Sequence, residues 1–160
     1  YIPKADKSAL KEWRHCYKML KAIPKNKDSF GLIHADLHSG NFLITPKYKI
    51  TSFDYDDSCY NYFIYDISIC LMRYYNSRKF ANKHHDFKYN QFFSKFKSGY
   101  NSENKIERSS WKMIPNIIRL RNVEMYSWFH KMIGTKNLSD ENKKFLEYMK
   151  AKIEDYQGTD

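Results

Sequence analysis

The residues best suited to chemistry lie in one short stretch of the chain, residues 34–66. His34, Asp36 and Asn41 follow the order H-x-D-L-x-x-x-N, a pattern typical of phosphotransfer loops. In such a loop the aspartate accepts the proton of a substrate hydroxyl, and the asparagine holds a magnesium ion. Asp54 comes thirteen residues after Asn41, at the end of a predicted strand, where a second metal ligand is expected. One carboxylate and one amide oxygen suit Mg²⁺, because this ion prefers hard oxygen donors.

Three short apolar runs surround these residues and predict strands over 30–34, 41–45 and 49–53. The last two runs are separated by Pro46-Lys47-Tyr48, which predicts a hairpin turn. The polar stretch ADLHSG lies between the first two runs and predicts a loop. The reactive residues are therefore expected on a loop and at the ends of a small β-hairpin.

Helical periodicity covers much of the remaining chain. We expect helices near 5–22, 63–75 and 86–98, and a last helix over 140–156 with Ser139 as its N-cap. Residues 103–133 form a long periodic segment in which Pro115 should kink or restart the helix. Together these elements predict an α+β fold, mostly α, with helices around a small catalytic β-hairpin in a single domain, 1–160.

Composition places the chain among globular proteins. Of its 160 residues, 42% are hydrophobic and 18% aromatic, which is too many aromatic residues for a disordered segment. No stretch approaches the ~18 apolar residues that span a membrane, and the first thirty residues contain no apolar signal-peptide core. The three cysteines are far apart and form no CxxC pair, which argues against a disulfide framework and a zinc knuckle. We therefore expect a cytoplasmic protein with no membrane partner.

The net charge of +10 is unevenly distributed along the chain. Residues 1–27 carry eight Lys and Arg against two acids, residues 28–72 carry two against six, and residues 73–160 carry eighteen against ten. We interpret the Lys-rich flanks as solvated helix faces and expect no nucleic acid partner. Asp56 and Asp57 lie in the acidic middle; one of them is a candidate contact for a second metal or a cationic substrate, and the alternative is a pair of solvated turn residues.

Residues 31–68 resemble the C-terminal lobe of the aminoglycoside phosphotransferase and choline kinase family, which has a protein-kinase-like fold. GLIHADLHSGNFLI is similar to the family's H-G-D-x-H-x-G-N loop, and FDYDDSCYNYFIYDIS is similar to its metal-binding segment. Ala35 stands where the family usually has glycine. By this resemblance the catalytic loop would contain the base Asp36 and the bracing residue His34, the magnesium and nucleotide ligands would be Asn41 and Asp54, and Asp66 would brace the loop through hydrogen bonds.

The resemblance also implies an activity. The family members are Mg²⁺-dependent kinases that transfer the γ-phosphoryl group of ATP or GTP to a hydroxyl of a small molecule, such as an amino sugar or an amino alcohol, including cationic ones. They hold the nucleotide between this lobe and a strand-rich N-terminal lobe, which the 160 residues do not contain. We therefore expect the chain to be the C-terminal lobe of a kinase whose N-terminal part lies outside these residues or was lost by cleavage or in evolution, and we expect the lobe to be inactive alone.

Two other interpretations remain open. A metal-dependent phosphoesterase would use Asp36, His38 and Asp54 as ligands of a two-metal site. It would need further ligands, for which only His84, His85 and His130 are available downstream. A non-catalytic binding module would hold an anionic partner with its basic flanks, but such a module has no reason to keep the base and the metal ligands. Asp66, in turn, could be only an acid that favours the start of a helix.

Overall fold

The computed structural model describes the backbone of residues 1–79, 83–133 and 138–156, and the side chains of these residues apart from 73–89. The chain divides into two compact units, Tyr1–Ala22 with Pro115–Asp160, and Ile23–Ile114. Whether the two units act as the single domain expected from the sequence stays a prediction. Within the described ranges, no helix is both long and apolar enough to cross a membrane.

The first unit contains α1 (Lys7–Lys21), α6 (Asp140–Tyr156) and nearly all of α5 (Ile114–Met132). Asp6 caps α1, because its side chain accepts the N–H of Ala9 at 3.2 Å. Ser139 lies just before α6, and its Oγ accepts the N–H of Asn142 at 3.3 Å. The helices predicted over 5–22 and 140–156, and the cap at Ser139, are therefore confirmed.

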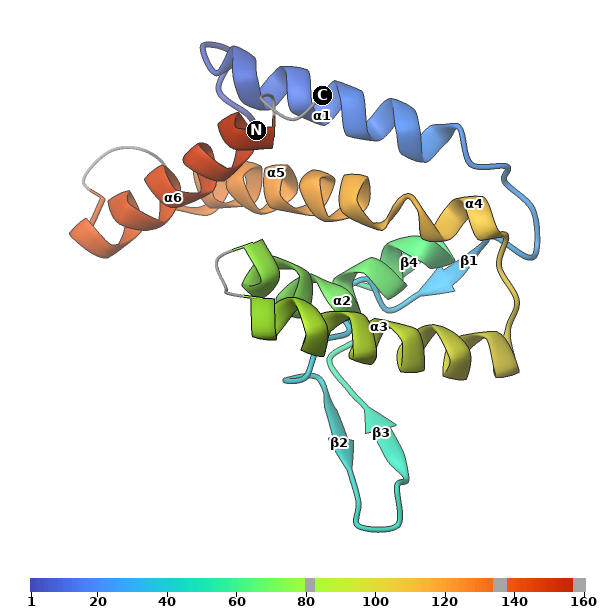
Figure 1. Ribbon diagram of the computed structural model, residues 1–160. Helices are drawn as coiled ribbons and strands as arrows, with labels where there is room; N and C mark the ends of the chain where they lie inside the picture. Colours follow the sequence, from blue (N-terminus) through green and yellow to red (C-terminus); the bar gives the residue numbers. More distant parts are fainter. Residues whose placement is uncertain (80–82, 134–137, 157–160) are drawn as a thin grey trace. The chain divides into compact units, whose positions relative to one another are not determined.

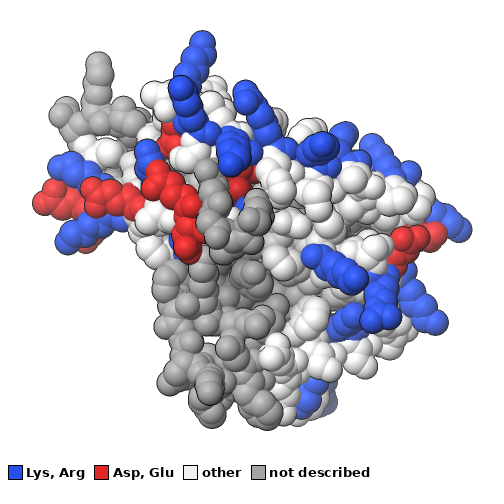
Figure 2. All heavy atoms as spheres, turned by 45° about the horizontal axis from the view of Figure 1, so that its top comes forward, with Lys and Arg blue, Asp and Glu red and all other residues white. Residues whose placement is uncertain are grey.

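Helix α1 is strongly amphipathic. Its inward face buries Ala9, Glu12, Cys16 and Leu20. The opposite face is exposed and carries only cations among its charged residues: Lys7, Lys11, Arg14, Lys18 and Lys21. Figure 2, in which the side that carries α1 is turned forward, shows Lys and Arg side chains projecting from the surface it displays. This arrangement agrees with the interpretation of the basic flanks as solvated helix faces.

The core of the first unit joins its three helices. A buried cluster contains Ala9 of α1, Val123 and Tyr126 of α5, and Met149 and Ile153 of α6. Removing such side chains from water supplies most of the stability of a small helical unit, because each fully buried aliphatic side chain contributes about 1.5–3 kcal/mol. The apolar face of α1 is therefore explained by packing alone.

The second unit contains two small antiparallel sheets and three helices: β1 (Phe30–Ile33), β2 (Phe42–Ile44), β3 (Ile50–Ser52), β4 (Cys59–Tyr62), α2 (Phe63–Lys79), α3 (Lys83–Glu103) and α4 (Arg108–Trp111). Strands β2 and β3 form the predicted hairpin, with Phe42 opposite Ser52 (Figure 1). Strand β4, which the sequence did not predict, pairs with β1 and places Phe30 opposite Tyr62. Because β4 is short and half exposed, only its pairing with β1 identifies it as a strand.

Helix α2 follows β4 directly and contacts both β1 and β4. The residues whose spacing predicted it, Ile64, Ile67, Ser68 and Leu71, are all buried. Helix α3 runs beyond the predicted 86–98 in both directions. The predicted α+β, mostly α fold class is confirmed, and beside the expected hairpin the structure has a second small antiparallel sheet.

The long periodic segment 103–133 is not one helix. Helix α3 ends at Glu103, α4 is a single turn, and α5 begins at Ile114 with Pro115 as its second residue. Proline is tolerated in a first helical turn, because the N–H that it lacks would have no partner within the helix there. Pro115 therefore restarts the helix, which was one of the two expected outcomes.

A buried ion pair links α1 to α5. Arg119 donates from Nε to Glu12 Oε1 at 2.6 Å and from Nη2 to Glu12 Oε2 at 3.0 Å, while both residues are less than 10% exposed. Nη2 also donates to the carbonyl of Tyr156 at 3.3 Å, which adds α6 to the network. Two parallel bonds between a guanidinium and a carboxylate fix the relative rotation of the helices.

Glu12→Gln should destabilise the protein strongly, because it leaves the Arg119 guanidinium buried without its countercharge. We expect a loss of about 3–5 kcal/mol in the free energy of unfolding, measured by urea denaturation. Lys11→Gln, on the exposed face of the same helix, should change stability by less than about 0.5 kcal/mol. Equal stabilities of the two variants would contradict the structural role of the pair.

Asp6 is a second polar centre of this unit. Its carboxylate accepts hydrogen bonds from Tyr126 Oη at 2.6 Å and from Ser8 Oγ at 2.8 Å, and Lys150 Nζ lies 3.5 Å away. Burial alone would raise the pKa of Asp6, but these contacts and the Ala9 N–H together lower it below its ordinary value. Burial and the hydrogen bond to Asp6 raise the pKa of Tyr126 in return.

The lowered pKa of Asp6 predicts a pH dependence of stability. The contribution of the ionised carboxylate is complete above the ordinary pKa of 3.8 and is lost as the pH falls through the lower folded-state pKa. Asp6→Asn should therefore cost about 1.5–3 kcal/mol near neutral pH and progressively less below about pH 4. Urea unfolding across this range, with the exposed Asp140→Asn as control, measures the difference, and a constant difference at every pH would refute it.

Candidate active site

One carboxylate ties the loop that carries His34 and Asp36 to helix α2. Asp66, in the first turn of α2, accepts the backbone N–H of His34 at 3.1 Å through Oδ2 and that of Ala35 at 2.9 Å through Oδ1. Both oxygens of Asp66 therefore bond to the loop, which an acid that only favours the start of its own helix would not do. Because about thirty residues separate the partners, the contact depends on the packing of α2 against β1.

Ala35, which stands where the family usually has glycine, has a left-handed backbone conformation. Its φ is 65°, in the left-handed region that glycine adopts readily and that costs an L-residue about 1–2 kcal/mol. Its methyl group is buried, and its N–H is held by Asp66. The loop thus accommodates an alanine in a conformation that glycine adopts more readily.

Asn41 brings the remaining parts of the site together. Its side-chain Nδ2 donates to the carbonyl of Asp36 at 3.0 Å, and its own carbonyl accepts the N–H of Phe53 at 3.0 Å. The β2–β3 hairpin lies between these contacts, so it returns the chain to the loop just before Asp54. The segments that carry the predicted base and both predicted ligands, eighteen positions apart at their extremes, therefore belong to one hydrogen-bonded structure.

The donor set suits a magnesium ion. Asn41 is 7% exposed, and because its Nδ2 is bonded to Asp36, its Oδ1 is the atom that a cation would contact. Asp54 is exposed and has a φ of 65°, a conformation that aspartate tolerates better than most residues. An amide oxygen and a carboxylate are the hard ligands that Mg²⁺ prefers, with phosphates and water completing its shell.

The described side chains do not favour the phosphoesterase interpretation. Among them, no three His, Cys, Asp or Glu residues lie close enough to hold a metal ion together. Of the additional histidines that this interpretation needs, His84 and His85 have side chains outside the described residues, and His130 belongs to the other unit. A two-metal site built on Asp36 and His38 therefore has no support from the residues that the structure describes.

His34 connects the loop to the segment around Asp54. Its Nε2 donates to the carbonyl of Phe53 at 3.0 Å, and its ring lies 4.5 Å from that of Tyr55. The hydroxyl of Tyr55 contacts Ser52 Oγ in β3. Sequence reasoning did not single out Phe53 or Tyr55, and its only signal was a pair of aromatic residues on either side of Asp54.

Asp56 and Asp57 lie exposed on the connection between β3 and β4. They follow Asp54 closely in sequence, so a second metal or a cationic substrate at this end of the hairpin would lie near them. Their participation in the site stays a prediction.

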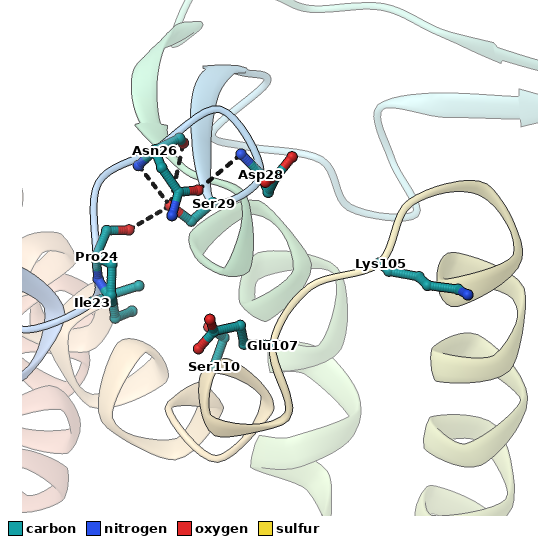
Figure 3. A pocket seen from close by; sticks show the side chains of 8 residues that line it. All are labelled: Ile23, Pro24, Asn26, Asp28, Ser29, Lys105, Glu107 and Ser110. Carbon is teal, nitrogen blue, oxygen red and sulfur yellow. Dashed lines mark hydrogen bonds between the residues drawn. The ribbon is translucent and has the colours of Figure 1, made fainter.

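A pocket of about 200 Å³ lies elsewhere in the second unit (Figure 3). It is lined by Ile23, Pro24, Asn26, Asp28, Ser29, Lys105, Glu107 and Ser110. Figure 3 shows that Ser29, Asn26 and the Pro24 carbonyl form hydrogen bonds within the segment before β1, while Lys105 points away from them. None of the residues singled out by the sequence lines this pocket, so it is separate from the loop that carries Asp36.

Comparisons with known proteins give a consistent result. A family model described as "Phosphotransferase enzyme family" matches residues 3–86. The amicoumacin kinase of Bacillus subtilis (strain 168) is 34% identical to this chain over 157 residues, which make up 96% of this chain and 46% of that protein. The chain thus spans about half the length of this relative.

Solved structures share the fold. An amicoumacin kinase in complex with AMP-PNP, Ca²⁺ and Ami matches with a TM-score of 0.82 and 31% identity, over 98% of this chain and 46% of that one. A microcompartment-associated aminopropanol kinase matches in fold, with a TM-score of 0.68 and 22% identity, over 95% and 44%. The prediction of a lobe of a kinase-like fold is confirmed.

The family match covers more than half of the chain and includes the loop with His34, Asp36 and Asn41, the hairpin and the segment that ends at Asp66. The hydrogen bonds that join these parts explain why their spacing fits the family pattern. The chain belongs to the phosphotransferase enzyme family.

Proposed function

We propose that this chain supplies the catalytic half of a kinase that transfers a phosphoryl group from a nucleoside triphosphate to a hydroxyl of a small molecule. The observation that carries the proposal is the position of Asn41, which bonds to the Asp36 carbonyl through its side chain and to Phe53 through its main chain. These two bonds gather a candidate base and two candidate metal ligands at one end of the hairpin. A binding module would not need this arrangement.

In the proposed reaction Asp36 is the general base. Its carboxylate accepts the hydroxyl proton while the substrate oxygen forms a bond to the γ-phosphorus and the bond between γ-phosphorus and the β–γ bridging oxygen breaks. The products are the phosphorylated substrate and a nucleoside diphosphate. His34 and Asp66 position this base by holding the loop that carries it. His34 donates to the Phe53 carbonyl, and Asp66 accepts the N–H groups of His34 and Ala35.

Asn41 and Asp54 are the proposed ligands of Mg²⁺. When bound, the ion would neutralise charge on the nucleotide phosphates. Asn41 is held for this role by its bonds to the Asp36 carbonyl in the loop and to the Phe53 N–H after β3, whereas the exposed Asp54, just beyond the end of β3, can turn toward the phosphates. The two side chains therefore contribute different things, a fixed oxygen and an adaptable one.

The relatives and the local charge support a proposal for the nucleotide and the substrate. The matching structure that is 31% identical holds AMP-PNP, which supports ATP rather than GTP. The segment from Asp54 to Asp66 contains four aspartates and no Lys or Arg, which favours a cationic substrate such as an amino sugar or amino alcohol. Because the chain spans 46% of its relatives, we propose that the other half completes the nucleotide site and that the 160 residues alone are a poor catalyst.

Asp36→Asn tests the base. In the protein extended to the length of its relatives, this change should lower kcat by about 10²–10⁴-fold, because it removes general base catalysis. Nucleotide binding, measured by calorimetry, should stay close to that of the wild type. Asp28→Asn, an exposed acid before β1, is the matched control and should leave both unchanged. Wild-type turnover in Asp36→Asn would overturn the assignment.

Asn41 and Asp54 predict a metal requirement. In the extended protein, Asn41→Ala and Asp54→Ala should each raise the Mg²⁺ concentration needed for half-maximal transfer by at least about tenfold, because each removes a ligand. The 160 residues alone should bind Mg²⁺ weakly in calorimetry, since the phosphates supply much of the coordination. Tight stoichiometric Zn²⁺ binding by the 160 residues would favour the phosphoesterase interpretation instead.

A further inference from the structure

His38 lies two residues after the proposed base and is in contact with it. Its Nε2 is 3.6 Å from Asp36 Oδ2, and both side chains are partly exposed. On the other side of the ring, Nδ1 accepts the backbone N–H of Gly40 at 3.0 Å. The imidazole therefore lies between the candidate base and the turn that leads to Asn41.

The bond from Gly40 determines the tautomer of the ring. A nitrogen that accepts an N–H carries no proton, so the proton of the neutral imidazole is on Nε2. Nε2 is the atom that faces Asp36. At 3.6 Å the contact is longer than a hydrogen bond, but catalytic contacts in ligand-free structures commonly shorten when the substrate binds.

Glycine at position 40 makes room for this ring. A Cβ added there would lie 2.8 Å from His38 Cε1 and 3.0 Å from its Nδ1, too close for the ring to remain in place. The turn is closed by the N–H of Asn41, which donates to the His38 carbonyl at 2.9 Å. The same short turn thus holds the imidazole next to Asp36 and the candidate ligand Asn41 next to the hairpin.

We propose that His38 is a positioning residue for the base: held in its Nε2–H tautomer by Gly40, it restrains the Asp36 carboxylate in the orientation that accepts the substrate proton. This role rests on the proposed kinase function. A neutral imidazole suits it, because it directs one donor at Asp36 Oδ2 without placing a positive charge beside the base. The restraint acts on rotation of the carboxylate, so its loss affects the chemical step more than nucleotide binding.

Kinetics of His38 variants test this role in the protein extended to the length of its relatives. His38→Ala should lower kcat by about 10–100-fold, a typical cost of losing an orienting partner, while the KM for nucleotide stays within about twofold. His38→Gln should recover most of this loss, since a glutamine amide places its N–H near the position of Nε2, whereas His38→Asn is too short and should resemble alanine. Wild-type turnover in His38→Ala, or equal losses in the glutamine and alanine variants, would overturn the proposal.

Gly40→Ala tests the same role from the other side of the ring. The added methyl should displace the imidazole and lower kcat about as much as His38→Ala, and the double variant should be no worse than either single one. Gly99→Ala is the matched control, because a Cβ there has no heavy atom within 4 Å. Additive losses would show that Gly40 acts independently of His38 and would contradict the proposal.

Nitrogen-15 NMR of the 160-residue chain gives a readout that does not depend on activity. His38 should show the Nε2–H tautomer, and Gly40→Ala should shift it toward a mixture, while Gly99→Ala leaves it unchanged. An Nδ1–H tautomer in the wild type would refute the inference. If the extended wild-type protein shows no phosphotransfer although the tautomer is as expected, the proposed function fails and not the geometry of His38.

Discussion

The carboxylate of Asp66 is the interaction on which the site depends. It joins the first turn of α2 to two consecutive N–H groups of the loop, those of His34 and Ala35. Without this partner, two partly buried donors would be unsatisfied, and the left-handed backbone of Ala35 would have no compensation for its strain. Helix α2 itself packs on β1 and β4. The side chain of Asp66 therefore fixes the loop to the packed part of this unit.

The β2–β3 hairpin lies between the two proposed metal ligands, Asn41 and Asp54, and links both of them to the loop. Its strands are only three residues each and largely exposed, so they cannot be stable by burial. They are held at their base, where Asn41 accepts the N–H of Phe53 and His34 donates to the Phe53 carbonyl. A short hairpin anchored in this way leaves Asp54 close to the loop while its carboxylate remains accessible.

The two compact units are held together by different interactions. The first is a helical cluster in which the buried Glu12–Arg119 network and the hydrogen bonds around Asp6 specify how its helices rotate against one another. The second combines a modest apolar core with a loop whose polar groups are satisfied mostly by backbone and carboxylate bonds. Among the residues that the structure describes, the non-glycine residues with positive φ are Ala35, Tyr48 and Asp54, all in the second unit, and two of these three lie at the candidate site.

The sequence by itself determined the helices with clear periodicity, the hairpin at Pro46-Lys47-Tyr48, and the candidate set of Asp36, Asn41 and Asp54, because these depend on local spacing and residue type. It did not reveal β4, which becomes a strand only by pairing with β1. It predicted a kink or restart at Pro115 but not the separate short helix α4 before it. It also did not reveal the contact of Tyr55 with His34 or the place of His38 between Gly40 and Asp36. These depend on neighbours brought close by the hairpin and on the path of a tight turn, and only the tertiary structure decides them.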